Sequence, residues 1–466
     1  MSDGLPESVR INAWRGVAAG GELVERANRW GSDDRGLPHS QASLPLGEVA
    51  DPRDWKHKDV GYGVLLPDSD LSAAEKAVGV DAPEPVRDLL EARPNTVLLR
   101  WKATIGERFV TRYFSDGTSQ SPTIGLSGFG VAKGKLPRYV LIVGTPDVIP
   151  WSVQYAFETR HAVGRLPLDV EGVGDYIDAM LSDWTGADVD PGAPLMWTVS
   201  IPGDITAEMR TVIAKPLEDK FTDEPRLPRF DHLSGNRATG AELLNALANA
   251  RPSLLVTSSH GWTEGDGPTL RNSLGVPVDI AHEPVALDAL DQAIPPGAIW
   301  YAQACCSAGG DAISNYEGLL AQGSAAYATV HHVAELGPTV APAATKLLGR
   351  PNPVRAVLGH VEPTFDWTLR VAETGQGLGA HIVSALSDNL IGDHQPVGYA
   401  FADYRAGVGE LHTQWVSTHN QFLKAEDVTL RDQLRNVLTR LRLTAIDRQS
   451  LVLLGDPTVT FPASGP

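Results

Sequence analysis

A histidine and a pair of cysteines each follow a short apolar segment, and together they could perform thiol chemistry. His260 stands in Ser-Ser-His-Gly after apolar residues 253–257, and Cys305 stands in Gln-Ala-Cys-Cys-Ser after apolar residues 298–302. A cysteine is a strong nucleophile as its thiolate, and a nearby imidazole can take the thiol proton and later protonate a leaving amine. The two residues therefore predict a Cys–His pair for acyl transfer.

The apolar segments predict how these residues come together. Short apolar runs bounded by Pro and Gly are typical of buried strands in a parallel sheet. Reactive groups in such sheets lie at the carboxyl edge, where the strands end. We therefore expect His260 and Cys305 at the same edge.

The order of these motifs resembles the caspase-like cysteine peptidases. The caspase signature is Gln-Ala-Cys, then Arg, Gln or Gly, then Gly, with a histidine upstream. This chain keeps Gln303-Ala304-Cys305 but departs at Cys306 and Ser307. Its pattern is closer to gingipain-like, clostripain-like and CHAT-domain bacterial peptidases. Three further segments occur in the order of that family, so that the resemblance covers roughly residues 135 to 460: 139–150, 163–167 and 453–458.

The alternation of strand-like and helical segments predicts an α/β fold with a mainly parallel sheet. The resemblance implies a caspase-like three-layer sandwich, in which helices flank the sheet and two subdomains lie side by side. We expect an accessory region over residues 1–95, a first α/β subdomain over 96–228 and a catalytic subdomain over 229–466. Within these, Pro216 is expected to end or kink a helix that begins near residue 206, and residues 325–330 resemble a strand.

The resemblance also implies roles for individual residues. His260 matches the catalytic histidine and Cys305 the nucleophile, while the backbone N–H groups of Gly261 and Cys305 match the oxyanion donors. Cys306 is the alternative nucleophile, and the competing interpretation is that both cysteines are small buried core residues.

Two acidic residues are candidates for orienting the histidine or for binding a basic substrate side chain. These are Asp147 and Glu158, for which an exposed loop charge is the simpler interpretation. No phosphate-binding loop and no His-Glu-x-x-His sequence occurs, so we expect no nucleotide cofactor and no zinc.

The composition and net charge indicate which partners and which cellular location to expect. The 466 residues carry a formal net charge of −18, with 42% hydrophobic and 21% charged residues. The acidic balance argues against nucleic acid or an anionic membrane as a partner. The start of the sequence lacks the features of a secretory signal, and adjacent cysteines form no disulfide framework, so a reducing cytoplasmic location is expected.

The leading hypothesis is a cysteine endopeptidase that cleaves protein or peptide substrates through a thioester. By resemblance, it would be a regulated effector of a bacterial defence or conflict system with a co-encoded or activating protein partner. The alternative is a catalytically inactive caspase-fold interaction or scaffold module. A third hypothesis is a transpeptidase, in which an amine captures the acyl group instead of water.

Overall fold

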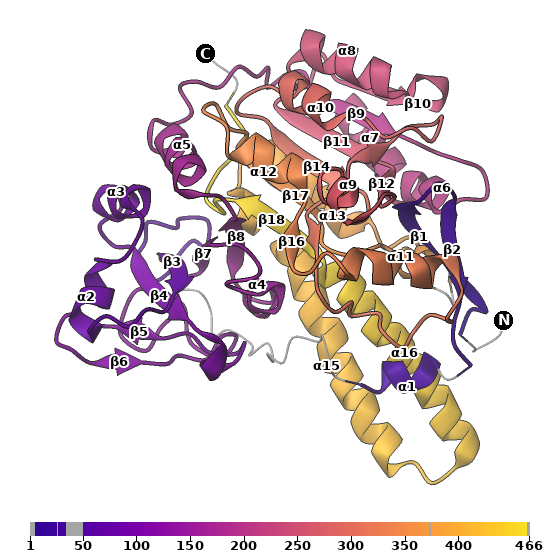
Figure 1. Ribbon diagram of the computed structural model, residues 1–466, viewed down its shortest axis with the longest axis horizontal. Helices are drawn as coiled ribbons and strands as arrows, with labels where there is room; N and C mark the ends of the chain where they lie inside the picture. The colour runs from indigo at the N-terminus through magenta and orange to yellow at the C-terminus, as the bar shows by residue number, and fades with distance from the viewer. Residues whose placement is uncertain (1–4, 26, 34–49, 372–373, 464–466) are drawn as a thin grey trace.

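A ten-stranded sheet forms the centre of the molecule (Figure 1). The computed structural model describes residues 5–25, 27–33, 50–371 and 374–463. In spatial order the strands are β10 (Asp231–Ser234), β9 (Leu195–Thr198), β11 (Leu254–Ser258), β14 (Ile299–Gln303), β17 (Ala356–His360), β18 (Leu451–Gly455), β8 (Ala162–Leu166), β7 (Tyr139–Val143), β3 (Tyr62–Pro67) and β4 (Val97–Trp101).

The sheet consists of two parallel halves that run in opposite directions. Every neighbouring pair is parallel except β17 and β18, which pair antiparallel from Ala356↔Gly455 to His360↔Leu451. The carboxyl ends of β9, β11, β14 and β17 therefore lie at one edge of the sheet, and those of β8, β7, β3 and β4 lie at the other.

Helices cover both faces of the sheet, as the apolar strands require. In β7, Leu141 and Val143 pack in one cluster with α3 (Glu84–Ala92) and α5 (Val170–Leu181), while Val140 and Ile142 pack in another with α4 (Trp151–Glu158). Successive side chains of a strand point to opposite faces, so a strand buried on both sides is apolar throughout. The predicted α/β sandwich with a mainly parallel sheet is confirmed.

The remaining helices lie between and around these strands. They are α2 (Ala73–Val78), α6 (Ile205–Met209), α7 (Lys215–Thr222), α8 (Gly240–Ala250), α9 (Gly267–Arg271), α10 (Leu287–Ala293), α11 (Ala325–Ala334), α12 (Pro342–Leu348), α13 (Ala380–Ser384) and α14 (Val397–Ala400). One prediction for this region was wrong, since residues 325–330 belong to α11. Of the two outcomes expected at Pro216, the helix does not end there. A π-helical turn (Arg210–Ala214) interrupts its regular path just before Pro216, which lies in the first turn of α7.

A smaller sheet joins the N-terminal segment to the edge of the main sheet. Its strand order is β13 (Pro277–Val278), β12 (His260–Trp262), β1 (Ser8–Trp14) and β2 (Ala18–Glu22). Strand β1 pairs parallel with β12, and β2 pairs antiparallel with β1. The N-terminal segment thus lies directly against the segment that carries His260. The predicted domain boundaries stay a prediction, although β3, from within residues 1–95, pairs in the main sheet.

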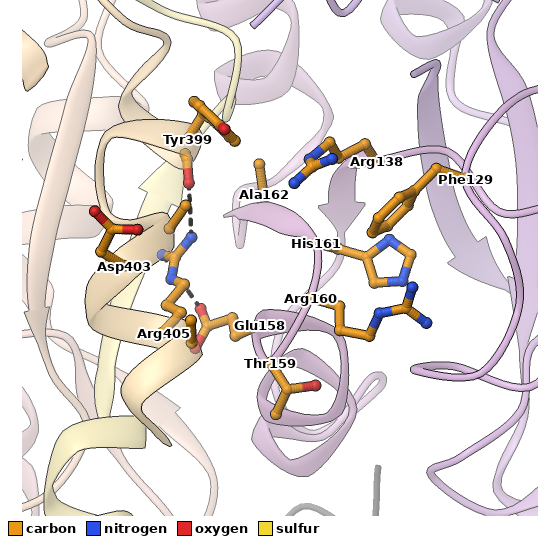
Figure 2. A pocket seen from close by; sticks show the side chains of 13 residues that line it. Phe129, Arg138, Glu158, Thr159, Arg160, His161, Ala162, Tyr399, Asp403 and Arg405 are labelled. Carbon is orange, nitrogen blue, oxygen red and sulfur yellow. Dashed lines mark hydrogen bonds and ion pairs between the residues drawn. The ribbon is translucent and has the colours of Figure 1, made fainter. Parts of the chain in front are cut away.

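Two long helices form a hairpin that projects from the body (Figure 1): α15 (Ala402–Lys424) and α16 (Val428–Gln449). Helix α1 (Ala27–Gly31) lies against it, since Trp415 donates to the carbonyl of Gly31 at 2.6 Å and Arg442 stacks 4.0 Å from the ring centre of Trp30. A pocket of about 250 Å³ lies between the start of α15 and the residues that precede β8 (Figure 2).

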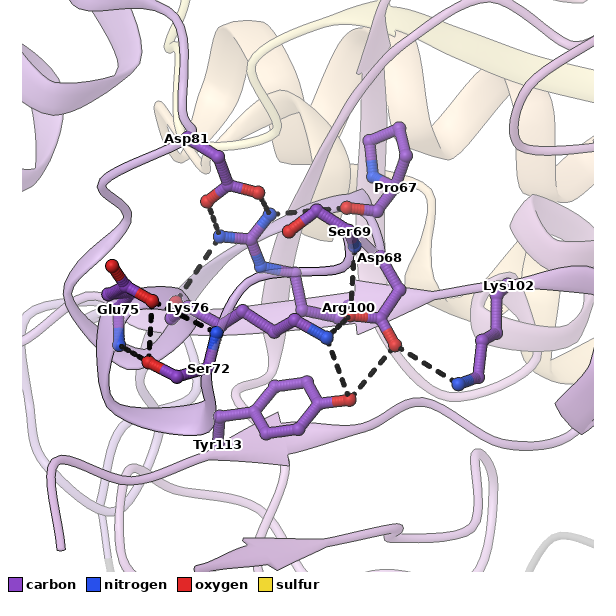
Figure 3. Close-up of polar contacts among 10 residues, drawn as sticks. All are labelled: Pro67, Asp68, Ser69, Ser72, Glu75, Lys76, Asp81, Arg100, Lys102 and Tyr113. Atoms are coloured by element: carbon purple, nitrogen blue, oxygen red, sulfur yellow. Dashed lines mark hydrogen bonds and ion pairs between the residues drawn. The ribbon is translucent and has the colours of Figure 1, made fainter. Parts of the chain in front are cut away.

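A buried ionic network closes the carboxyl ends of β3 and β4 (Figure 3). Arg100 is almost fully buried and donates to Asp81 at 2.6 and 3.0 Å, and to the carbonyl of Pro67 at 3.1 Å. Nearby, Lys76 pairs with Asp68 at 2.9 Å. A buried guanidinium is tolerated only with such compensation. The network therefore fixes how α2 and the turn after it sit on the sheet.

Removing one partner from this network should destabilise the fold strongly. We expect Asp81→Ala to lower the free energy of unfolding by about 3 kcal/mol, because it leaves the Arg100 guanidinium uncompensated. The matched control is Asp116→Ala, which removes an exposed pair with Lys133 and should change it by no more than about 0.5 kcal/mol. Urea denaturation measures both, and equal losses would contradict this account.

Candidate active site

Four parallel strands deliver polar residues to one edge of the sheet. Asp204 follows β9, His260 follows β11, Cys305 follows β14 and Glu362 follows β17. The strands are held in register, since Ser258 pairs with Thr198 on one side and with Gln303 on the other. The structure thus places His260 and Cys305 on adjacent strands at one edge, as the apolar segments indicate.

His260 is held on one side by an aspartate. Its Nε2 lies 3.0 Å from Oδ2 of Asp204, which caps the first turn of α6. The imidazole is 1% exposed, and its Nδ1 is buried with no hydrogen-bond partner among the described residues. In the neutral ring whose Nε2–H donates a hydrogen bond to this carboxylate, the unpartnered Nδ1 carries the lone pair.

The Asp204 carboxyl is held in its charged form. Burial alone would raise its pKa, but the hydrogen bond from His260, together with bonds from Thr206, outweighs burial and lowers the pKa to about 2. The Thr206 backbone N–H donates at 2.8 Å, as expected of a helix N-cap. Asp204 is therefore an anion that fixes both the tautomer and the orientation of His260.

Cys305 contacts Gly261, the residue that follows His260. A Cβ atom added to Gly261 would lie only 2.0 Å from the carbonyl oxygen of Cys305, so the two backbones touch. Only glycine permits this approach. Sγ of Cys305 donates to the Gly261 carbonyl at 3.4 Å, which requires the neutral thiol. In this arrangement the thiol proton is directed to a carbonyl oxygen rather than to His260.

Cys306 has an unusual backbone conformation and a raised pKa. Its φ is +55°, in the left-handed region that a side chain rarely adopts, and such strain gathers at functional sites. The sulfur of Cys305 and burial, with a contribution from Glu362, raise the pKa of Cys306 well above its usual value. Cys306 therefore stays a thiol, and its S–H can donate to a thiolate at Cys305.

Glu362 follows β17 and is the fourth polar residue at this edge of the sheet. It accepts hydrogen bonds from the backbone and side chain of Asn315 at 3.1 and 2.9 Å, and burial raises its pKa to about 7. The charge of this carboxyl therefore changes near neutral pH. Its negative charge opposes a thiolate, so it favours the neutral form of Cys306.

The structure separates the two other acidic candidates from this pair. Asp147 is exposed beyond the carboxyl end of β7, which runs opposite to β14, and so follows the other edge of the sheet. Glu158 is not in an exposed loop but is 4% exposed in α4, with β17 and β18 lying between its neighbour β8 and β14. The specificity and orienting roles of both residues stay predictions.

Glu158 lines the pocket that Figure 2 shows, together with Arg138, Arg160 and His161. Its carboxylate lies 3.7 Å from Arg405 and accepts from Gln154 at 3.1 Å. Burial raises the pKa of Glu158 to about 7, although Arg405 and Gln154 oppose the shift. The carboxylate is thus already committed to a guanidinium of this chain.

Asp204 and Glu362 were missed by sequence reasoning. The signal for Asp204 was present, because Asp204-Ile205-Thr206 is an N-cap pattern after the apolar segment 195–200. What the sequence did not provide was the spatial order of the strands, which places β9 next to β11. Glu362 gave no pattern at all, since it simply follows β17.

Comparisons with known proteins give little beyond this geometry. No protein-family model matches the chain, and no curated protein matches it. Among solved structures, the separase–securin complex of Saccharomyces cerevisiae is similar at a TM-score of 0.32 and 13% identity. The similar region covers 73% of this chain but only 16% of that chain. A likeness this distant assigns neither a fold family nor an activity.

Two searches for other features of function concern only the described part of the chain. There, no three residues among His, Cys, Asp and Glu are grouped as metal ligands. Over the same residues, no helix combines the length and apolar character that crossing a membrane requires.

The Asp204–His260 pair predicts a specific pH dependence of stability. The folded pKa of Asp204 lies below the ordinary value of 3.8, so the stabilisation is present above about pH 4 and is lost as the pH falls towards 2. Asp204→Asn should remove about 1 to 2 kcal/mol at pH 7, allowing for solvent screening, and should flatten this acid limb.

The control is Asp219→Asn on the exposed surface of α7, which should leave the acid limb unchanged. Urea denaturation between pH 2 and 7 measures both variants. An acid limb of the same steepness in Asp204→Asn and the parent chain would contradict the assignment.

Proposed function

We propose that this chain is a cysteine endopeptidase of the caspase-like kind that acts through a thioester intermediate. The observation that carries the proposal is the state of His260. Its Nε2 is bound to an anionic aspartate, while its buried Nδ1 has no partner among the described residues. Other buried polar atoms among the described residues also lack a hydrogen-bond partner. Nδ1 of His260 differs from them because it stands at the edge of the sheet that also carries Cys305.

The chemistry assigns a role to each group in turn. Nδ1 of His260 takes the proton from Sγ of Cys305, and the thiolate adds to the carbonyl carbon of the peptide bond. The C–N bond then breaks, and the amine leaves with the proton from His260. Water adds to the thioester, releases the carboxylic acid and restores the thiol. Asp204 stabilises the imidazolium formed on the way.

The oxyanion would form where the two strand ends meet. Backbone N–H groups of Gly261 and Cys305 are the proposed donors. The contact between these backbones supports the proposal, because it brings both donors to one place without a side chain between them. Cys306, which stays protonated, would donate to the thiolate, and so Cys305 is the preferred nucleophile.

Substrate and setting extend the proposal beyond the geometry. We propose protein or peptide substrates, a reducing cytoplasmic location, and a co-encoded or activating protein partner within a bacterial defence system. The partner and the defence role rest on the sequence resemblance. The reducing location has support from Cys305 and Cys306, which are both free thiols.

One observation favours a second candidate function, an inactive interaction module. Both cysteines are 0% exposed, and they belong to a hydrophobic cluster with the N-terminal strand β1. A permanently sealed site would bind partners through its surface and never meet a peptide bond. The two functions differ in whether Cys305 can ever react.

A cleavage profile on a mixed peptide library tests the proposal. Cys305→Ala and His260→Ala should each reduce kcat by about a thousandfold or more, as removal of a nucleophile or base does. Asp204→Asn should lower kcat more than it raises KM, by about ten- to a thousandfold.

The matched comparison is Cys306→Ala, which removes only the proposed donor to the thiolate and should lower kcat by no more than about tenfold, far less than loss of the nucleophile. Reductant, calcium and candidate partners are supplied in every assay. Turnover that survives Cys305→Ala but not Cys306→Ala would contradict the assignment, and no cleavage by a folded chain whose Cys305 reacts with iodoacetamide favours the inactive module.

A further inference from the structure

The N-terminal strand covers the proposed catalytic edge from outside. Strand β1 pairs parallel with β12, with Ala13 opposite Gly261 and Trp14 opposite Trp262, and Thr263 donates to the Trp14 carbonyl at 2.8 Å. The other edge of β12 is already taken by β13, where Gly261 pairs with Pro277. Within the described structure, both edges of the segment that carries His260 are therefore occupied.

The side chains of β1 lie near the two cysteines and His260. Val9, Ile11 and Ala13 are at most 1% exposed and share one hydrophobic cluster with Cys305 and Cys306. Trp14 covers the imidazole side, since its ring centre lies 5.7 Å from that of His260 and 4.0 Å from that of His282, on which it stacks. Cys305 is itself 0% exposed, so no substrate carbonyl reaches its Sγ in this arrangement.

The attachment of β1 is shorter on the catalytic side than elsewhere. It meets β12 at two paired positions, but it meets β2 at four. Its polar anchors lie on the segment after β17: Thr364 donates to the side chain of Asn12 at 2.9 Å, and Arg10 pairs with Asp366 at 2.9 Å. The strand ends in the exposed turn 15–17, where Val17 is 58% exposed.

Extended peptides commonly bind proteins by adding a strand to an open sheet edge. We propose that β1 is a removable internal inhibitor, which occupies the edge of β12 where an extended peptide substrate would pair. This inference rests on the proposed peptidase function and describes how that activity would be regulated. Loss of β1 would free the backbone of Gly261 and let Sγ of Cys305 leave the Gly261 carbonyl for the Nδ1 of His260.

The test separates β1 from the folded chain without mutating the site. A recognition sequence for a specific protease is placed in the exposed turn 15–17, the intact chain is purified, and the turn is then cut. The released peptide is removed by size-exclusion chromatography in mild denaturant, followed by return to buffer. Alkylation of Cys305 and Cys306 by iodoacetamide is timed by mass spectrometry, and circular dichroism checks the fold.

We expect the alkylation rate of Cys305 to rise at least about tenfold after cutting, and a synthetic peptide of residues 5–16 to slow it again. A second variant, Trp14→Ala with Asn12→Ala, loosens the strand without cutting and should raise the rate in the same direction. The matched control is Val17→Ala, which alters only an exposed side chain and should leave the rate unchanged.

Three results would overturn the inference. Cys305 in the intact chain could react as fast as an unfolded thiol, the folded cut chain could keep the slow rate, or the peptide could stay bound through separation. Library cleavage distinguishes this from failure of the proposed function. Faster alkylation without any cleavage would support the inhibitor strand and contradict the peptidase function. Equal cleavage by the intact and the cut chain would support the peptidase function and contradict the inhibitor strand.

Discussion

The contact between the backbones of Gly261 and Cys305 is the constraint on which the rest of the site depends. A Cβ atom at position 261 would lie 2.0 Å from the Cys305 carbonyl oxygen, so no other residue fits without moving one strand end. This approach places the cysteine beside the histidine segment and directs two backbone donors to one place. It also lets the thiol donate to the Gly261 carbonyl, the resting arrangement that any activation has to break.

The reversal between β17 and β18 decides which polar residues share the proposed catalytic edge. Because the two halves of the sheet run in opposite directions, Asp204, His260 and Cys305 gather at one edge, while Asp147 follows the other. The fold thus separates residues that a fully parallel sheet would bring to the same side. The ionic network around Arg100 lies at the other edge of the sheet, at the carboxyl ends of β3 and β4.

Much of the sheet could be predicted because its strands are short, apolar and bounded by Pro and Gly. The segments that became β11 and β14 were recognisable for this reason, and so was the placement of His260 and Cys305 at one edge of the sheet. The aspartate beside His260 could not be predicted, because that contact depends on β9 lying next to β11. Strand order is a long-range property that local sequence pattern does not encode.

Two local signals were also outweighed by their surroundings. Pro216 is accommodated by the π-helical turn before it, and Ala325–Val330 pack as a helix in spite of their strand-like residues. The role of the N-terminal strand was invisible for a different reason. Val9, Ile11 and Ala13 alternate with polar residues, which is a strand pattern that sequence reasoning overlooked. The pairing of this strand with β12 and β2 is a long-range contact that the pattern does not specify.

The central claim is that Cys305 is the nucleophile and that His260 activates it. The most direct test is to label the nucleophile covalently with a reagent that resembles the substrate. A chain freed of β1 is treated with a library of peptidyl acyloxymethyl ketones, and the adduct is located by peptide mapping with fragmentation. The account predicts a thioether on Cys305 that is lost in His260→Ala and retained in Cys306→Ala. An adduct on Cys306, or none in a folded chain whose thiols iodoacetamide reaches, would contradict it.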